Sequence, residues 1–414
     1  MKVLHLCTAD IRGGAAKGAY ALHRALLSLG VESRMLVGRK YGSDETVQQA
    51  AGAAARLSER LRRGIDGLPL YRYALTGDSF WSVGWLARGI ERTVRRMAPD
   101  IVHVQWTGGG FLSVEDIARI PVPVVWTLRD MWSFTGGCHY AAGCSRYVAA
   151  CGCCPQLRSR RPNDLSHAMA ERKRSGWARP NLSVVPISNW LAARARASTA
   201  MQGARIDVIH NGVDTRCFRP ADPAAARRRF GLPADRPLLA FSALNPLRDP
   251  RKGFAHLREA LGRLPLDARP DLVVIGQDAP ASPPDMPVLT HYLGHVEGEE
   301  GLASAYSAVD AMAAPSLEEA FGKVHAEAMA CGTPVLAYDA GGPAEIVRHR
   351  ETGYLARPQD IDDLSAGIGW CLSAVAQGPA LAEAARARAV REFDTGVIAR
   401  RYLDHYRASL ENSR

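Results

Sequence analysis

With 414 residues the sequence is too long for one ordinary hydrophobic core, and two domains of roughly 200 residues are expected. Its apolar fraction of 47% and charged fraction of 23% are typical of a globular protein and exclude a disordered chain. No run of 18 or more uncharged apolar residues occurs, and "MKVLHLCTAD" lacks the shape of a signal peptide, so a cytoplasmic protein is predicted. The net charge of +10 leaves nucleic acid, anionic lipid and phosphorylated substrates open.

The first half of the sequence alternates short apolar runs with helical segments. Residues 1–10 predict a strand, residues 11–30 a glycine loop and a helix that ends at Gly30, and residues 31–38 a second strand. Further strands are predicted at 99–106, 121–128, 181–188 and 205–212. Fully apolar strands separated by helices predict a parallel sheet with helices on both faces.

After the turn-rich residues 211–222 the same alternation starts again. Strands are predicted at 237–244, 270–276, 288–294, 310–316 and 333–339, with helices that include 303–309 and 323–330. The sequence therefore predicts an α/β fold of two doubly wound, Rossmann-like domains. Because such sheets bind ligands beyond the carboxyl ends of their strands, we expect the two domains to face each other across a cleft.

One basic region, residues 56–96, combines many arginines with apolar residues. The apolar residues at roughly helical spacing are Leu57, Leu61, Ile65 and Leu68, and Phe80, Trp81 and Trp85 lie nearby. Such a stretch can rest on an anionic membrane surface. It can equally be a charged face over ordinary core contacts, and both interpretations stay open here.

Five of the nine cysteines crowd one short region, and they are Cys138, Cys144, Cys151, Cys153 and Cys154. The cluster ends in a C-x2-C pair, which predicts a structural zinc ion held by Cys138, Cys144, Cys151 and Cys154. The spacing is not that of a standard zinc ribbon. Free thiols, or a disulfide, are therefore alternatives.

Two loops have the composition of phosphate-binding segments. Gly13 and Gly14 lie at a strand-to-helix turn, where backbone N–H groups can approach a phosphate, although a purely structural turn is as good an interpretation. Arg248, Arg251 and Lys252 precede a helix that starts near residue 254, and such cations suit a diphosphate that leaves. The alternative is a solvated basic turn.

The stretch "PSLEEAFGKVHAEAMACGTPV" places two carboxylates, Glu319 and Glu327, eight residues apart. In one continuous helix they would lie about 80° apart, so they could not share a face. Good helix formers begin after Gly322, which predicts that Glu319 lies in a loop and Glu327 in the helix. The start of that helix suits an anion or sugar hydroxyls.

Taken together, these segments resemble the retaining glycosyltransferases of family 4, which have the two-domain GT-B fold. The stretch above matches the family's two glutamates separated by seven residues, and "VIHNGVDTRCF", "RKGF", "YLGHV", "AYSAVDAMAAPS" and "DAGGPAEIV" also match in the family's order. Residues 127–157 are similar to a subgroup associated with bacterial exopolysaccharide and lipopolysaccharide assembly. The implied organisation is an acceptor-binding domain at 1–212, a nucleotide-sugar-binding domain at 213–395, and a helix at 396–414 that packs back on the first domain.

Carried over residue by residue, the resemblance implies a donor site around the two glutamates. Glu319 would touch donor-sugar hydroxyls, and Glu327 would accept hydrogen bonds from the nucleotide ribose. Lys252 with Arg251 would compensate the charge of the diphosphate, and Gly14 would meet it from the N-terminal domain. The other expected donor contacts are Gly13, Arg248, Phe321, Gly322, Lys323 and Val324.

The resemblance also places Asp130 in the catalytic set. Family members often have His at the preceding position, but here it is Arg129, which cannot act as a general base near neutral pH. No cofactor is expected for catalysis, and Asp360 and Asp362 are predicted to begin a helix rather than to hold a metal. Because no nucleophile is evident, we expect same-face attack in which the departing diphosphate helps to deprotonate the acceptor hydroxyl.

The predicted function is that of a hexosyltransferase acting on a nucleotide-sugar donor and a glycan or lipid-linked oligosaccharide acceptor, as a peripheral protein at the inner face of the cytoplasmic membrane. A first alternative is a nucleotide-sugar epimerase or phosphorylase with the same fold. A second is a basic nucleic-acid-binding protein with a zinc-binding cysteine cluster. No recognised nucleic-acid module occurs, and the glycine loops fit small phosphates better, so no nucleic-acid partner is expected.

Overall fold

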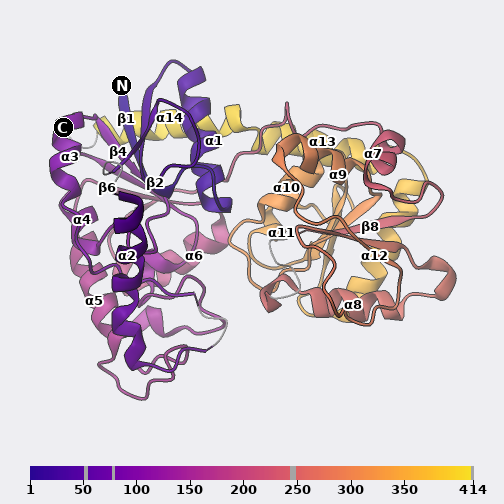
Figure 1. Cartoon of the computed structure of the whole chain (residues 1–414), viewed down its shortest axis with the longest axis horizontal. Helices are drawn as coiled ribbons and strands as arrows, with labels where there is room; N and C mark the ends of the chain where they lie inside the picture. The colour runs from indigo at the N-terminus through magenta and orange to yellow at the C-terminus, as the bar shows by residue number, and fades with distance from the viewer. Residues whose placement is uncertain (51–54, 77–79, 243–248, 412–414) are drawn as a thin grey trace. The chain divides into compact units, whose positions relative to one another are not determined.

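The computed structural model describes the chain except for residues 51–54, 77–79, 243–248 and 412–414, together with the side chains of a few residues at the start of one helix. It divides into two compact units (Figure 1). One unit comprises Met1–His210 and Ile398–Arg414, and the other comprises Asn211–Val397. These divisions lie within three residues of the boundaries expected from the sequence.

The N-terminal unit is built on a parallel sheet. Among the described residues it has seven strands in the order β3-β2-β1-β4-β5-β6-β7. The strands are β1 (Lys2–Ala9), β2 (Glu32–Arg39), β3 (Val47–Gln49), β4 (Ile101–Val104), β5 (Val124–Leu128), β6 (Leu182–Pro186) and β7 (Arg205–Ile206). The central strands β4, β5 and β6 are buried along their whole length, as expected for strands covered on both faces.

Helices of the N-terminal unit flank this sheet (Figure 1). They are α1 (Gly14–Ser28), α2 (Ala55–Gly67), α3 (Ile90–Met97), α4 (Val114–Ala118), α5 (Leu165–Trp177), α6 (Asn189–Ala197) and α14 (Thr395–Glu411), with short 3-10 turns η1 (Leu68–Arg72), η2 (Trp132–Phe134), η3 (Arg146–Ala149) and η4 (Thr199–Met201). The end of α1 is set by Gly30, whose φ of 77° fits glycine, and its N–H donates to the Leu27 carbonyl over 3.0 Å.

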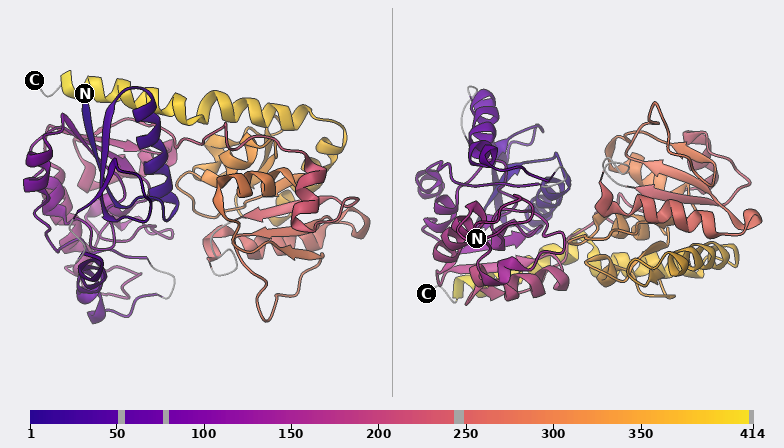
Figure 2. Two further views of the ribbon diagram at one scale, coloured as in Figure 1. Left: turned by 45° about the horizontal axis from the view of Figure 1, so that its top comes forward. Right: turned by 90° about the horizontal axis from the view of Figure 1, so that it is seen from below.

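The last helix, α14, closes the core of the N-terminal unit (Figure 2). Ile398 and Tyr402 pack in one buried cluster with Val3 and Ile101. In addition, the Tyr406 hydroxyl lies 2.6 Å from Nδ1 of the buried His103. The end of the chain thus completes the same core that the first strand begins.

The C-terminal unit repeats the architecture. Within the described part of the chain its parallel sheet has six strands in the order β10-β9-β8-β11-β12-β13. The strands are β8 (Leu238–Ser242), β9 (Asp271–Ile275), β10 (Thr290–Tyr292), β11 (Ala311–Ala313), β12 (Val335–Tyr338) and β13 (Gly353–Ala356). The helices are α7 (Pro223–Phe230), α8 (Phe254–Arg263), α9 (Gly298–Ser307), α10 (Lys323–Ala330), α11 (Pro343–Ile346), α12 (Ile361–Ala376) and α13 (Ala380–Phe393), with turns η5 (Pro250–Lys252) and η6 (Leu266–Ala268).

The fold class predicted from the sequence is confirmed, since both units are α/β with parallel sheets of Rossmann type. Two short strands, β3 and β13, were not predicted. Asp360 caps α12 by accepting a hydrogen bond from the Asp363 N–H over 2.9 Å, as expected. No helix among the described residues is both long and apolar enough to cross a membrane.

Candidate active site

The two glutamates of the "PSLEEAFGKVHAEAMACGTPV" stretch lie where the sequence predicted them. Glu319 is in the loop after β11, and Glu327 is in α10. Gly322 caps the helix with a φ of 91°, a backbone conformation that favours glycine. A Cβ at this position would also lie 2.5 Å from the imidazole of His325, so the tight entry into α10 depends on Gly322.

A cavity of about 200 Å³ lies at this loop and the first turn of α10. Its lining residues are Phe241, Ser242, Lys252, Ala314, Ser316, Glu319, Gly322, Lys323 and Val324. The beginning of a helix carries N–H groups without intrahelical partners and the positive end of the helix dipole. The cavity therefore combines a carboxylate, two lysines and a helix N-terminus, which suits a ligand with both hydroxyl groups and negative charge.

Lys252 and Glu319 form an ion pair beside this cavity, with 2.6 Å between Nζ and Oε2. Both side chains are mostly buried. Burial raises the pKa of the Glu319 carboxyl, but the charge and hydrogen bond of Lys252 outweigh it and hold the pKa below its ordinary value. Glu319 is thus a carboxylate at neutral pH, able to accept hydrogen bonds.

Close backbone approaches hold the Glu319 loop in place. The N–H of Gly342 donates to the Glu319 carbonyl over 2.9 Å, and a Cβ on Gly342 would lie 2.3 Å from the Cα of Phe321. On another side, a Cβ on Gly253 would lie 2.0 Å from the Pro315 carbonyl oxygen. Gly342, after β12, and Gly253, before α8, therefore allow their two loops to pack closely against the loop that carries Glu319. This role of the glycines in "DAGGPAEIV" was not predicted from the sequence.

Glu327 is buried in α10 and is paired within its own helix. Its Oε1 lies 2.9 Å from Nζ of Lys323, one turn earlier, and the Tyr306 hydroxyl lies 3.5 Å from Oε2. His325, which was not predicted as a site residue, is completely buried. Its two ring nitrogens each lie 3.1 Å from a carbonyl oxygen, of Gly322 and of Ala314. His325 thereby links the start of α10 to the end of β11.

The basic residues before α8 divide into different roles. Lys252 lines the cavity, whereas the Arg251 guanidinium pairs with Asp249, at 2.7 Å between Nη2 and Oδ2. Arg251 is not among the described residues that line the cavity, although its carbonyl accepts a hydrogen bond from Leu317 over 2.7 Å. Arg248 lies outside the described residues.

The remaining site residues predicted from the sequence belong to the N-terminal unit. Gly13 caps α1 with a φ of 91°, at the carboxyl end of β1. A Cβ on Gly13 or Gly14 would meet no described atom within 4 Å, so this turn is open. The positive φ at position 13 favours glycine, whereas no described atom would clash with a Cβ there.

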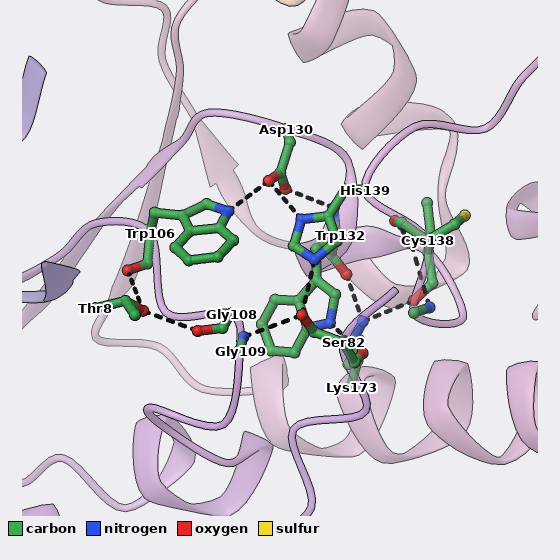
Figure 3. A network of polar contacts seen from close by, with 12 residues as sticks. Thr8, Ser82, Trp106, Gly108, Gly109, Asp130, Trp132, Cys138, His139 and Lys173 are labelled. Atoms are coloured by element: carbon green, nitrogen blue, oxygen red, sulfur yellow. Dashed lines mark hydrogen bonds and ion pairs between the residues drawn. The ribbon is translucent and has the colours of Figure 1, made fainter. Parts of the chain in front are cut away.

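Asp130, at the end of β5, is the centre of a polar network (Figure 3). Its Oδ2 accepts hydrogen bonds from Trp106 Nε1 over 2.7 Å and from His139 Nδ1 over 2.6 Å. The other ring nitrogen of His139 lies 2.9 Å from the hydroxyl of Ser82. Burial raises the pKa of Asp130, but His139 and the hydrogen bonds outweigh it and lower the pKa.

Ser82, His139 and Asp130 are connected by hydrogen bonds in the same order as the serine, histidine and aspartate of a nucleophilic triad. However, Ser82 is only 2% exposed, and its oxygen already accepts a hydrogen bond from the Gly109 N–H over 3.1 Å. The network therefore positions Asp130 rather than presenting a nucleophile. His139 was not predicted as a site residue, although it lies in the chain between Asp130 and Cys144, which were.

Arg129 points into the N-terminal unit. Its Nη2 donates to Gln105 Oε1 over 2.9 Å, and a Cβ on Gly18 of α1 would lie 2.7 Å from its Nη1. The missing Cβ of Gly18 makes room for the guanidinium beneath α1. This position supports the helix that begins at Gly13 and Gly14.

The four cysteines predicted as zinc ligands all line one cavity of the N-terminal unit, and all are free thiols. Among the described residues no group of three or more His, Cys, Asp or Glu side chains is already arranged to hold a metal ion.

The predicted site residues are divided between the two units. The N-terminal unit carries Gly13, Gly14, Asp130 and the cysteines, and the C-terminal unit carries Lys252, Glu319 and α10.

Two family models match the chain. Residues 12–216 match the model described as Glycosyltransferase Family 4, and residues 225–388 match the model described as Glycosyl transferases group 1. The chain therefore carries two domains of glycosyltransferase type, one in each half.

Curated relatives share part of the sequence. The D-inositol 3-phosphate glycosyltransferase of Mycobacterium avium is 38% identical over 198 residues, which are 45% of this chain and 44% of that protein. The protein of the same name from Nocardia farcinica is 33% identical over 262 residues, 59% of this chain and 55% of that protein. The match spans about half the length of these relatives.

Solved structures share the fold over almost the whole chain. Sucrose-phosphate synthase from Thermosynechococcus elongatus is similar with a TM-score of 0.69, 21% identity and coverage of 99% of both chains. HepE from Anabaena, in complex with UDP-glucose, is similar with a TM-score of 0.64, 18% identity and coverage of 99% of this chain and 100% of HepE. These similarities confirm the GT-B type of fold.

Proposed function

We propose that this chain, with its family 4 and group 1 glycosyltransferase domains, transfers a hexose from a nucleotide sugar to a hydroxyl acceptor with retained anomeric configuration. The observation that carries the proposal is the cavity at the N-terminus of α10. There Nζ of Lys252 lies 2.6 Å from Oε2 of Glu319, although the two residues are 67 positions apart in the sequence. In a sugar diphosphate, the hydroxyl groups can donate to a carboxylate and the phosphates can pair with a cation.

In this proposal Glu319 accepts hydrogen bonds from the donor sugar. Lys252 and the N-terminus of α10 bind the diphosphate, whose charge grows as the glycosidic bond breaks. Glu327, buried one turn further along α10, accepts hydrogen bonds from the ribose. HepE shows that a protein of this fold holds UDP-glucose, so a nucleotide sugar is compatible with the architecture.

The chemistry then depends on positioning and on stabilising the leaving group. An acceptor hydroxyl attacks on the face from which the diphosphate departs, and a diphosphate oxygen takes its proton. Arg129 carries no proton-accepting nitrogen near neutral pH, so it cannot be the base. Catalysis without a metal ion is part of this proposal.

For the acceptor we propose a glycan or lipid-linked oligosaccharide bound by the N-terminal domain at the inner face of the cytoplasmic membrane. The supporting observation is a set of exposed apolar side chains at the end of α2 and in η1, namely Leu61, Ile65, Leu68 and Tyr71. Tyr71 is 84% exposed, which is unusual for a large apolar side chain. Together with the net charge of +10 these residues suit an anionic membrane surface.

A second candidate acceptor is an inositol phosphate. It is favoured by the 38% identity to the Mycobacterium avium protein, which is named for D-inositol 3-phosphate. Such an acceptor is small, soluble and anionic, so it would need cations in the N-terminal domain rather than a membrane surface.

The function is tested in two steps. A thermal-shift screen against UDP-, GDP- and ADP-sugars identifies the donor, because a ligand that binds only the folded state raises the melting temperature. The identified donor is then incubated alone, with inositol 3-phosphate, and with a lipid-linked oligosaccharide. Sugar transfer with retained configuration supports the proposal. Conversion of the donor to an epimer without acceptor, or no stabilisation by any nucleotide sugar, would reject it.

A further inference from the structure

We propose that Cys138, Cys144, Cys151 and Cys154 bind one structural zinc ion in the N-terminal unit. All four line a single cavity of about 20 Å³, formed by the long connection between β5 and α5 together with Trp81 and Ser166. A cavity of this size has room for one water molecule or one small ion. Four cysteines around a space for one ion is the donor set of a closed, tetrahedral zinc site.

The four thiols share the lining of this cavity. Cys138 lies near enough to Cys151 and Cys154, and Cys144 to Cys151 and Cys154, for charges on these sulfurs to interact. The thiols line the cavity without forming a closed coordination shell, since no metal-holding group exists among the described residues. Zinc binding therefore requires rotation of the cysteine side chains toward the centre, with release of the thiol protons.

The backbone around two of the cysteines is bent into a compact turn. Four consecutive residues, 150–153, have positive φ angles of 61°, 59°, 94° and 44°, and only Gly152 is a glycine. Such conformations cost energy in the other three residues and persist where the surrounding structure enforces them. The turn brings Cys151 and Cys154 to the same cavity and leaves Cys153 out of its lining.

A buried cation lies beside the cluster. Lys173 of α5 is 0% exposed, and its ammonium group contacts the carbonyl oxygens of Trp132 and Thr135 and lies 4.0 Å from the centre of the Trp132 ring. Cys138 and Cys151 are close enough that negative charge on either sulfur would stabilise this ammonium. Four thiolates with one Zn²⁺ carry a net charge of about −2. This charge would add to that of Asp130 in stabilising the ammonium group of Lys173, which lies beside the network (Figure 3).

The position of the cluster gives the metal a structural task. Cys138 directly precedes His139, which binds Asp130 in the network described above. A zinc ion at Cys138 would therefore fix the segment that carries His139. This inference does not depend on the proposed glycosyltransferase activity.

The test is metal analysis of the full chain purified under reducing conditions with zinc available. We expect about one zinc per chain in the wild type and in the control variant Cys153→Ser, and loss of most of it in Cys151→Ser and Cys154→Ser. If these two variants do not fold, the wild-type chain is loaded with Co²⁺ instead. The thiolate charge-transfer and tetrahedral absorption bands of Co²⁺ are then expected.

Three results would overturn the proposal. One is a folded wild-type chain that contains no zinc after exposure to it and whose four thiols all react as free thiols. Another is a disulfide between any two of the four cysteines in the reduced, folded protein. The third is equal zinc retention by Cys153→Ser and Cys154→Ser.

Discussion

Lys252 and Glu319 have separate expected roles, yet their side chains lie next to each other in the structure. The family resemblance assigned Lys252 to a diphosphate and Glu319 to a sugar. The structure shows that they also bind each other, over 2.6 Å. In the proposed function, a diphosphate entering the cavity would compete with Glu319 for the ammonium group and so free the carboxylate for sugar hydroxyls. The ion pair would keep both groups charged and oriented until a donor binds.

Replacing Glu319 is expected to reduce activity much more than stability. Glu319→Ala and Lys252→Ala should each lower turnover by about two orders of magnitude or more, as for the loss of one charge-stabilising group. The measurement is the initial rate of transfer by purified variants whose melting temperatures are also recorded. Glu318→Gln, which changes the neighbouring carboxylate outside the cavity lining, is the matched control and should keep nearly normal activity.

Near-normal transfer by Glu319→Ala, or an equal loss in Glu318→Gln, would contradict the role assigned to Glu319. Arg251 offers a further comparison, because its guanidinium is already paired with Asp249. Its substitution by Ala should cost less activity than Lys252→Ala.

At the scale of elements, the site depends on loops whose backbones lie so close together that a Cβ at the contact would clash. Gly342 and Gly341 precede α11, and Gly253 precedes α8, yet all three contact the segment between β11 and α10. Each glycine allows a neighbouring backbone to lie where a Cβ would be. The loop that carries Glu319 is therefore positioned by two other loops.

Gly342→Ala should displace the Glu319 loop, because the added Cβ would lie 2.3 Å from the Cα of Phe321. We expect a loss of activity of at least tenfold, together with a lower melting temperature. Gly369→Ala in α12 is the control, since its Cβ has its nearest neighbour at 4.0 Å and alanine favours a helix by about 1 kcal/mol. Full activity in Gly342→Ala would show that the close approach is not needed.

The sequence predicted the elements of this site better than their contacts. The helix formers after Gly322 gave the bounds of α10, Lys323–Ala330, and the loop position of Glu319. The strands β3 and β13 were missed because neither carries the apolar run that marked the others: β3 is Val-Gln-Gln, and β13 begins with glycine. The role of Gly342 was also missed, since the contact joins segments more than 20 residues apart and leaves no local signal.

At the scale of the whole molecule, a row of buried histidines lies in the core that α14 completes. The rings of His5 and His103 have centroids 4.9 Å apart, and those of His5 and His23 are 5.7 Å apart. His103 also contacts Tyr406 of α14. Single histidines have no sequence period, so this arrangement could be found only from the folded chain.

The stability of the protein should therefore decrease in mild acid. Burial lowers the pKa of His5 and His103 well below 6.5 and that of His23 to about 4. The unfolded chain then binds more protons than the folded one, so the free energy of unfolding falls as the pH drops below 6.5. For His23 alone the loss is on the order of 3 kcal/mol once the pH is below both pKa values.

Urea unfolding at pH 7, 6 and 5 measures this effect, and the midpoint of the transition should move to lower urea at each step. A midpoint that is the same at pH 7 and pH 5 would show that these histidines accept protons in the folded state without cost.

The central claim is that Lys252 and the start of α10 bind the diphosphate of a nucleotide sugar. The most direct measurement is titration calorimetry of the nucleoside diphosphate identified in the donor screen, with the wild type, Lys252→Ala and Glu318→Gln. We expect Lys252→Ala to bind at least about tenfold more weakly, a difference of about 1.4 kcal/mol, and Glu318→Gln to bind as the wild type does. Equal affinity of the wild type and Lys252→Ala would contradict the claim.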